Sequence, residues 1–300
     1  MAIVLGPNQY GKAEVRLVRV NRGSGDGAGR HQLTDLDVSV SLAGDLADSH
    51  LTGDNAKVLT TDTQKNTVYA FAREGVGEIE EFGLRLAWHF VDSQPSVHRA
   101  QVRLRQHSWE RVDLDGDPAP HSFARSGREV RTVTVTYDGE HAWVISGLHD
   151  LVLLNTTDSE FWGYPKDGYT TLPETKDRIL ATAVTARWRH LSADTDFAES
   201  YAAARQHLVE GFAGTYSFSL QQTLYAMGRR VLEHRPEIAE VRLALPNRHH
   251  FLVDLAPYGL DNPGEVYHAA DRPYGLIEGT VARDDVPPAP LAWDLAEGGL

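Results

Sequence analysis

Hydrophobic and polar residues alternate from Ala13 to Val20, a pattern that predicts a strand with one buried and one wet face. A second strand is predicted at 34–44. Between them, Gly23–Gly29 contains four glycines but has neither a following Lys-Ser/Thr pair nor a helix start. We therefore interpret this segment as a hairpin loop and not as a phosphate-binding loop.

The next segments have helical spacing. Asp62 is predicted as the N-cap of a helix that runs to about Arg73. Apolar residues from Ile79 onwards, without a proline or a turn pair, predict another helix through about Asp92. Strands are then expected at 99–113 and 129–137.

A similar order of elements recurs in the second half, where a polar excursion, Phe161 to Lys176, separates two groups of strands. The expected elements are strands at 130–137 and 142–147, an apolar stretch at 151–154, a strand at 178–190, helices over Phe197–Phe212 and Leu220–Leu232 with Ser217 and Ser219 as capping candidates, and closing strands at 239–246 and 249–254. Residues from Asp284 onwards should form an extended, proline-rich tail.

Short matches between the halves indicate a duplicated unit. Gln101–Leu104 reads against Glu240–Leu243, 139 residues later. Two further matches pair Val38–Ser41 with Val133–Thr136 and Thr60–Asp62 with Thr156–Asp158. We therefore expect an α+β chain with units at 1–128 and 129–283 and a tail at 284–300. Each unit is an antiparallel sheet with a helix pair on one face, so the open face and edges predict oligomerisation.

Composition narrows the function classes. At 41% hydrophobic and 24% charged residues, the chain is typical of a globular protein. Its net charge of −13 argues against nucleic acid or an anionic membrane as a partner. With no cysteine, disulfides, thiolate nucleophiles and cysteine-ligated zinc are excluded. No apolar run approaches the ~20 residues of a membrane span, and Met1–Pro7 lacks signal-peptide character, so a cytoplasmic location is expected.

Several segments, in order along the chain, resemble the signature segments of the uricase (urate oxidase) family. They are Tyr10–Lys12, Leu59–Thr67, Phe161–Gly163, Thr175–Leu180, Ser219–Thr223 and Leu245–Phe251. The resemblance runs from about residue 8 to residue 283. It implies tandem tunnelling-fold units, with four chains forming a hollow barrel and active sites at subunit interfaces. It also implies that urate is oxidised by dioxygen to 5-hydroxyisourate and hydrogen peroxide without a metal or an organic cofactor.

The resemblance assigns substrate-binding roles that the residue chemistry supports. Urate is a planar anion, and the planar guanidinium of Arg178 matches its edge bidentately. Gln221 adds one donor and one acceptor, and Phe161 offers a flat face for stacking. The Leu220 N–H, in the first turn of a helix, is available to donate. Thr61 and the Asp62 backbone, as the family arrangement implies, would bind the opposite side of urate from a neighbouring subunit.

Three residues resemble the family's proton relay: Lys12, Thr61 and His249. A threonine hydroxyl is too weakly acidic to act alone at neutral pH, so a basic neighbour such as Lys12 is required. His249 titrates near neutrality and suits a proton shuttle. Asn247 carries an amide that could hold dioxygen or water above urate. His250 stands where an aromatic residue is expected from the family and is given no role.

Two alternatives stay open at this stage. The first is another purine- or pterin-handling enzyme of the same fold, some of which bind zinc through histidines. Because His249 and His250 are adjacent, a regular strand would point them to opposite faces, which disfavours one shared metal. The second is a non-catalytic purine-binding oligomer, which would not need the set of Lys12, Thr61, His249 and Asn247.

Overall fold

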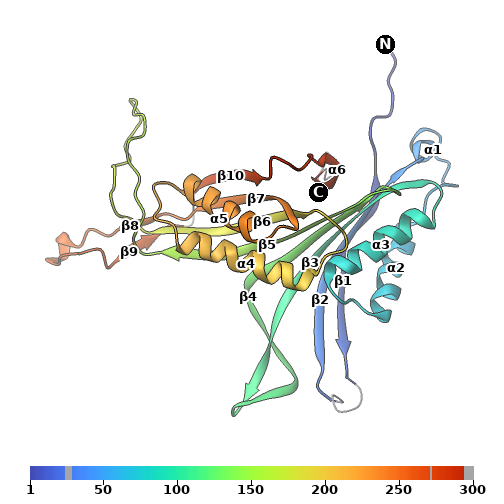
Figure 1. Ribbon diagram of the computed structural model, residues 1–300, viewed down its shortest axis with the longest axis horizontal. Helices are drawn as coiled ribbons and strands as arrows, with labels where there is room; N and C mark the ends of the chain where they lie inside the picture. The colour runs from blue at the N-terminus through green and yellow to red at the C-terminus, as the bar shows by residue number, and fades with distance from the viewer. Residues whose placement is uncertain (24–28, 271, 294–300) are drawn as a thin grey trace. The chain divides into compact units, whose positions relative to one another are not determined.

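The computed structural model describes residues 1–23, 29–270 and 272–293 of the chain (Figure 1). The glycine-rich loop predicted at Gly23–Gly29 therefore lies mostly outside the described residues. The chain divides into two compact units: residues 1–147, 189–198 and 285–300 form the first, and residues 148–188 and 199–284 form the second. No helix among the described residues is both long enough and apolar enough to cross a bilayer.

The first unit has the strand order β1-β2-β3-β4, with each neighbouring pair antiparallel. Its elements are β1 (Tyr10–Asn21), β2 (Gln32–Gly44), α1 (Ala47–Leu51), α2 (Thr61–Glu74), α3 (Ile79–Asp92), β3 (Val97–Leu114), β4 (Asp117–Tyr137) and the short α6 (Pro290–Trp293). The next strand, β5 (Ala142–Asn155), passes from the first unit into the second at Leu148.

The second unit has the strand order β5-β6-β7-β10 and a separate two-stranded sheet, β8-β9. Its further elements are β6 (Leu180–His190), α4 (Phe197–Ala213), α5 (Leu220–His234), β7 (Ile238–Asn247), β8 (His250–Leu252), the 3-10 turn η2 (Ala256–Tyr258), β9 (Tyr267–Ala269) and β10 (Gly275–Ala282). These are the strand and helix-pair elements that define an α+β fold.

The core of the first unit lies between its sheet and α3. In the β2–β3 register, Val38 pairs with Leu104 and Val40 with Val102, and all four side chains are buried. The helix lies close to this layer at Gly83, where an added Cβ would stand 2.8 Å from Val135 Cγ2. A larger residue at this position would have to push the helix off the sheet.

The second unit has a matching core between its helices and β7 and β10. An added Cβ at Gly228 on α5 would stand 2.6 Å from Val281 Cγ2 on β10. The end of this helix is closed by Arg283. Its guanidinium donates to the carbonyl of Leu232 (2.6 Å), to that of Arg235 (3.2 Å) and, through Nε, to that of Ile238 (2.8 Å). The last carbonyls of a helix lack partners within the helix, so this side chain satisfies groups that α5 itself cannot.

The tunnelling-fold plan is confirmed, and the helices follow the predicted spans closely. Of the three sequence matches between the two halves, one joins equivalent elements. Gln101–Leu104 lies in β3 and Glu240–Leu243 in β7, and each of these is the first strand after a helix pair. The other matches are wrong. Val133–Thr136 lies in β4, which pairs with β3 inside the first unit, and Thr156–Asp158 does not begin a helix as Thr60–Asp62 does. The expected boundary at residue 129 accordingly falls within β4.

Three local predictions need correction. The N-cap of α2 is Thr60, whose side chain accepts from the Thr63 N–H, and not Asp62. The strand at 249–254 does not close the second unit, because β8 pairs with β9 while β10 pairs with β7. The tail is not extended throughout: Pro290–Trp293 forms a helical turn in which Ala292 is buried.

Candidate active site

The predicted site residues fall into two groups, one in each compact unit. Lys12 belongs to the first group and lies on β1, where the register with β2 shifts between Lys12 and Val15. Within this bulge Glu14 has φ +54°, and its N–H donates to Ser39 Oγ at 3.0 Å. Bulges of this kind re-aim a side chain at the edge of a sheet. Gly11 permits the close approach of the strands, since a Cβ there would overlap the Val40 carbonyl.

Thr61 and Asp62 occupy the first turn of α2. The start of this helix is fastened to β1 by Tyr10, whose hydroxyl donates to the Leu59 carbonyl at 2.9 Å. Gln64, which is fully buried, donates to the same carbonyl at 3.3 Å. Among the described residues, no group hydrogen-bonds the half-buried Thr61 hydroxyl, whereas the Thr60 and Thr63 hydroxyls bond each other at 2.8 Å.

Asp62 ties this group together electrostatically. Its carboxylate accepts from Lys65 Nζ at 2.5 Å and from Asn66 Nδ2 at 3.0 Å. The Lys65 hydrogen bond, with a smaller contribution from the charge of Lys12, holds the pKa of Asp62 below its ordinary value. Lys12 and the start of α2 therefore lie close enough for the charge of Lys12 to act on Asp62.

The second group is built around Arg178 and Phe161. The Arg178 guanidinium carbon lies 5.2 Å from the centroid of the Phe161 ring. Burial lowers the pKa of Arg178 below its ordinary value, which still leaves a cation at neutral pH. Phe161 is held by a two-bond bridge with Thr175: the Phe161 N–H donates to the Thr175 carbonyl at 2.9 Å, and the reverse bond measures 3.0 Å.

Two side-chain hydrogen bonds and one backbone bridge link Arg178 to the helix that carries Leu220 and Gln221. Arg178 Nε donates to Ser159 Oγ at 3.1 Å, and Ser159, which is fully buried, forms a bridge with Ser217. Thr223 Oγ1 donates to Ser217 Oγ at 2.8 Å. Ser219 is the N-cap of α5 and accepts from the Gln222 N–H at 3.2 Å, so the predicted capping role of Ser219 is confirmed.

Asn247 is the last residue of β7, and His249 lies two residues further on, close to Arg178. The Arg248 N–H donates to the Ala181 carbonyl at 2.8 Å, which fixes this segment beside the start of β6 and therefore near Arg178. Burial, and then the charge of Arg178, lower the pKa of His249. The structure thus brings together Phe161, Arg178 and His249, with Asn247 two residues away at the end of β7.

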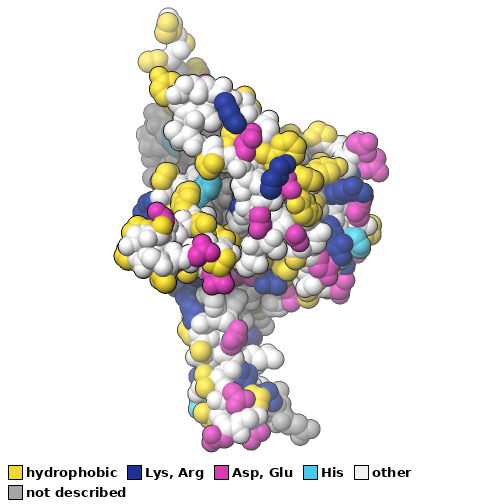
Figure 2. Space-filling model, turned by 90° about the vertical axis from the view of Figure 1, so that its left-hand side faces the viewer, with side chains coloured by type: hydrophobic (Ala, Val, Ile, Leu, Met, Phe, Trp, Pro, Cys, Tyr) yellow, Lys and Arg dark blue, Asp and Glu magenta, His cyan; other side chains and the backbone are white. Residues whose placement is uncertain are grey.

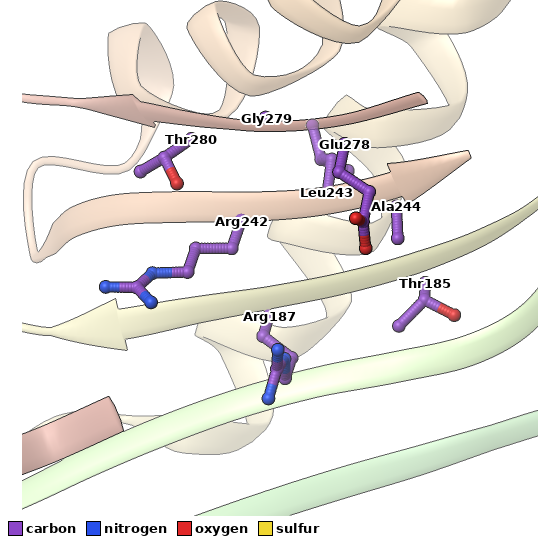
Figure 3. A pocket seen from close by; sticks show the side chains of 8 residues that line it. All are labelled: Thr185, Arg187, Arg242, Leu243, Ala244, Glu278, Gly279 and Thr280. Carbon is purple, nitrogen blue, oxygen red and sulfur yellow. The ribbon is translucent and has the colours of Figure 1, made fainter. Parts of the chain in front are cut away.

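A separate hollow lies on the second unit's sheet and contains none of the predicted residues. Its volume is about 310 Å³, and Arg187, Arg242 and Glu278 reach into it from β6, β7 and β10 (Figure 3). This hollow is lined by side chains from strands alone.

Metal ligation was the main chemical alternative. Within residues 1–23, 29–270 and 272–293, no three histidine, aspartate or glutamate side chains are grouped to hold an ion. The His250 ring nitrogen Nδ1 lies 3.1 Å from the Arg248 carbonyl, and its backbone pairs with Ala269 in β8–β9. His249 stacks on Phe251 with ring centroids 5.9 Å apart. The two adjacent histidines therefore have different surroundings.

Supporting residues were missed by sequence reasoning. Tyr10 and Gln64 lie inside the signature segments but were given no role, and Ser159 lies outside every predicted motif. Ser217 and Ser219 were both predicted as capping candidates, and the structure has Ser219 as the N-cap of α5. Ser217 acts instead through its side chain, which donates to the Ser219 carbonyl at 3.1 Å.

Comparison with known proteins identifies the family of the chain. The uricase family model matches residues 8–136 and 144–278, and the chain belongs to the uricase family. Uricase from Arthrobacter globiformis is 52% identical over 282 residues, which cover 94% of this chain and 91% of that protein. Uricase from Aspergillus flavus is 37% identical over 93% of this chain and 96% of its own length.

Solved structures show the same fold. The crystal structure of the Arthrobacter globiformis uricase superposes with a TM-score of 0.91 at 50% identity, covering 96% of this chain and 98% of that one. Urate oxidase from Bacillus sp. TB-90 has a TM-score of 0.80 at 24% identity, covering 92% of this chain and 100% of its own. The second likeness supports the fold alone.

Proposed function

We propose that this uricase-family chain oxidises urate with dioxygen, and that each complete site combines the first group of one subunit with the second group of another. The observation that carries the proposal is the Arg178–Phe161–His249 cluster, because a partly desolvated cation beside an aromatic face suits a planar purine anion. Urate oxidation follows from family membership. The residue roles, the cofactor-free chemistry and the assembly are the finer parts of the proposal.

In this site Arg178 and Gln221 bind one edge of urate, and Phe161 stacks on its face. The Leu220 N–H lies in the first turn of α5, where helix N–H groups lack carbonyl partners within the helix. Thr61 and the Asp62 backbone bind the opposite edge. These contacts favour the deprotonated substrate, whose electron-rich ring is the electron donor.

The relay of Lys12, Thr61 and His249 moves the protons. Overall, urate loses two electrons and gains a hydroxyl from water, giving 5-hydroxyisourate, while dioxygen gains two electrons and two protons to form hydrogen peroxide. Lys12 accepts a proton through the Thr61 hydroxyl, and His249, with its lowered pKa, stays neutral and able to accept a proton at neutral pH. Asn247 holds dioxygen and then water.

The assembly we propose is a homotetramer. Large hydrophobic side chains of the second unit are exposed around β8 and β9, among them Phe251, Leu252, Tyr258 and Leu260. Figure 2 is viewed from the left-hand side of Figure 1, where β8 and β9 lie. It shows hydrophobic side chains at the surface among acidic and basic ones. Surfaces of this kind typically mark an interaction site. The cytoplasmic location expected from the sequence stays a prediction.

Activity tests the reaction directly. The purified chain should consume urate, followed by its near-ultraviolet absorbance, and release hydrogen peroxide in parallel. Exhaustive chelation and dialysis should leave this rate unchanged. A rate lost on dialysis and restored by a metal ion or a flavin would contradict the cofactor-free mechanism, and stoichiometric zinc in elemental analysis would favour the zinc-dependent alternative.

Subunit mixing tests whether the site is shared. Assayed at urate well below the raised KM of Arg178→Ala, Thr61→Ala and Arg178→Ala should each be nearly inactive alone. In mixed pairs one site carries both defects and the other carries neither, so random reassembly should restore about a quarter of wild-type sites. Unmixed variants taken through the same dissociation serve as controls. No recovery despite demonstrated subunit exchange would show that each chain completes its own site.

A further inference from the structure

Glu160, the residue before Phe161, has a carboxylate that gathers three side chains. Its Oε2 accepts from Trp162 Nε1 at 2.5 Å and from Lys176 Nζ at 3.4 Å, and its Oε1 accepts from the Tyr216 hydroxyl at 2.6 Å. The side chain is only 13% exposed. None of these four residues belongs to the binding or relay groups assigned above.

These bonds, together called the Glu160 clasp, restrict the backbone conformation of Phe161 through the residues that precede and follow it. Glu160 and Trp162 flank Phe161, and successive side chains of an extended segment point in opposite directions. A bond between the flanking side chains therefore fixes the backbone that presents the Phe161 ring on the other side. Lys176 strengthens the clasp, because its Nζ lies 3.2 Å from the centroid of the Trp162 ring. Lys176 also directly follows Thr175, which is the bridge partner of Phe161.

Tyr216 extends the clasp toward α5. The Glu160 N–H donates to the Ser217 carbonyl at 2.7 Å, and the Ser217 N–H donates to the Asp158 carbonyl at 2.9 Å. The Tyr216 hydroxyl adds a side-chain bond to the same junction. One carboxylate thus joins the loop that carries Phe161 to the segment that leads into Leu220 and Gln221.

The charge state of Glu160 matches this role. Hydrogen bonds from Tyr216 first and Trp162 second hold the pKa of Glu160 below its ordinary value, so it is ionised at neutral pH. An ionised carboxylate accepts from all three donors, whereas a neutral amide would turn a donor group toward at least one of them.

We propose that Glu160 is a positioning residue for urate binding, which sets the Phe161 ring against Arg178 by clasping Trp162, Lys176 and Tyr216. This inference rests on the proposed function, because it requires Phe161 to be the stacking face. Glu160 itself does not touch the substrate, and its effect passes through Phe161 and the start of α5.

The main test is Glu160→Gln, assayed with urate and with xanthine as an inhibitory purine. The urate KM and the xanthine inhibition constant should both rise about tenfold, the low end of what losing a hydrogen bond to a charged group costs. Turnover at saturating urate should change less than about threefold, because the relay is untouched. Trp162→Phe and Tyr216→Phe, which each remove one donor, should give smaller rises and guard against misfolding of the Gln variant.

Two comparisons separate positioning from general damage. In a Phe161→Ala background, Glu160→Gln should cause little further loss, because a residue that acts through Phe161 is non-additive with it. Glu233→Gln, which removes the same charge where it pairs with Arg229 at 2.7 Å on α5, should leave the urate KM unchanged.

The outcomes distinguish this inference from the proposed function. If Phe161→Ala weakens urate binding but Glu160→Gln does not, only the positioning role is overturned. Equal losses from Glu160→Gln with and without Phe161 would overturn it as well. If Phe161→Ala has no effect on urate or xanthine affinity, the stacking assignment fails and the positioning role fails with it.

Discussion

Each of the two groups of candidate residues includes the first turn of a helix, α2 in the first unit and α5 in the second. The residues around these two helix starts differ. Thr61 opens α2 behind the N-cap Thr60, and Leu220 opens α5 behind the N-cap Ser219. Each cap accepts from the N–H three residues on, at 3.1 Å for Thr63 and 3.2 Å for Gln222. The two helix starts are therefore capped in the same way, by a side-chain oxygen of an extended residue, and their other first-turn N–H groups lack partners within the helix.

Their chemistry has diverged. In the first unit the neighbours are exposed charges: the Asp62 side chain is 68% exposed and paired with Lys65, and Lys12 lies nearby. In the second unit the neighbours are a partly desolvated Arg178, the Phe161 ring and the buried Ser159. On the proposed function, Lys12 in the first unit would serve proton transfer, and Arg178 and Phe161 in the second unit would hold a flat anion. Substitutions of Lys12 should accordingly act mainly on turnover, and substitutions of Arg178 mainly on affinity.

The largest effect is expected from the first group. Lys12→Ala should lower kcat by roughly 100-fold or more, because it removes the general acid–base group. The xanthine inhibition constant should change little, since Lys12 itself is not among the proposed contacts to the purine. Lys57→Ala, which removes a lysine paired with Asp45 and Asp48, is the matched control and should keep wild-type kcat. Normal turnover by Lys12→Ala would make Lys12 a structural residue.

The next effect belongs to the second group. Arg178→Ala should raise the urate KM by about 10- to 100-fold, as expected for a lost charge-assisted hydrogen bond. Arg187→Ala is the control, because Arg187 is also an arginine whose pKa is lowered by burial but lies in the strand-lined hollow. If both variants bind xanthine equally well, the binding role of Arg178 is refuted.

A smaller, diagnostic effect concerns pH. His249 must be neutral to accept a proton, so kcat/KM should fall as pH drops through its pKa. The charge of Arg178 helps to lower that pKa, so Arg178→Gln should move the acidic limb of kcat/KM to higher pH. His250→Gln should move it the same way but less, because His250 makes the smallest of the recorded contributions. If the acidic limb of the kcat/KM profile lies at the same pH in Arg178→Gln as in the wild type, a group other than His249 controls that limb.

The smallest expected effects come from the caps. Thr60→Ala and Ser219→Ala should each lower the free energy of unfolding by about 1 kcal/mol, measured by urea titration, through loss of the side-chain acceptor at the helix start. Thr60→Ser should restore most of the loss because it keeps the hydroxyl. Equal stability of Thr60→Ala and wild type would show that Asp62 or Thr63 caps the helix in solution.

Much of this arrangement could be predicted from local sequence, and the failures have identifiable causes. Apolar periodicity located α3 from Ile79 to Asp92 because the period of 3.6 is unbroken there. The residues Thr60, Thr61 and Asp62 are all good N-caps, so sequence alone could not choose the one with extended backbone. The polar residues His149 and Asp150 read as a strand end in the sequence, whereas β5 continues through them with Asp150 at φ 61°.

Non-local pairing explains the remaining errors. The strand β10 contains Gly275 and Gly279, weak strand formers, and is recognisable only through its register with β7, where Ile277 meets Leu245. Site residues were found through an ordered set of motifs that resembles a family. Their supports were not, because the partners of Arg178 and Phe161, such as Ser159 and Thr175, depend on a loop geometry that no period encodes.

The guanidinium of Arg283 has a consequence for how far the chain can be shortened. Because it binds carbonyls at the end of α5 and at the start of β7, it belongs to the closure of that helix although it follows the last strand. A shortened chain that ended at Ala282 would keep every strand of the second unit and still leave those carbonyls bare. The shortest chain that keeps α5 capped therefore ends at Arg283 and not at the last residue of the sheet.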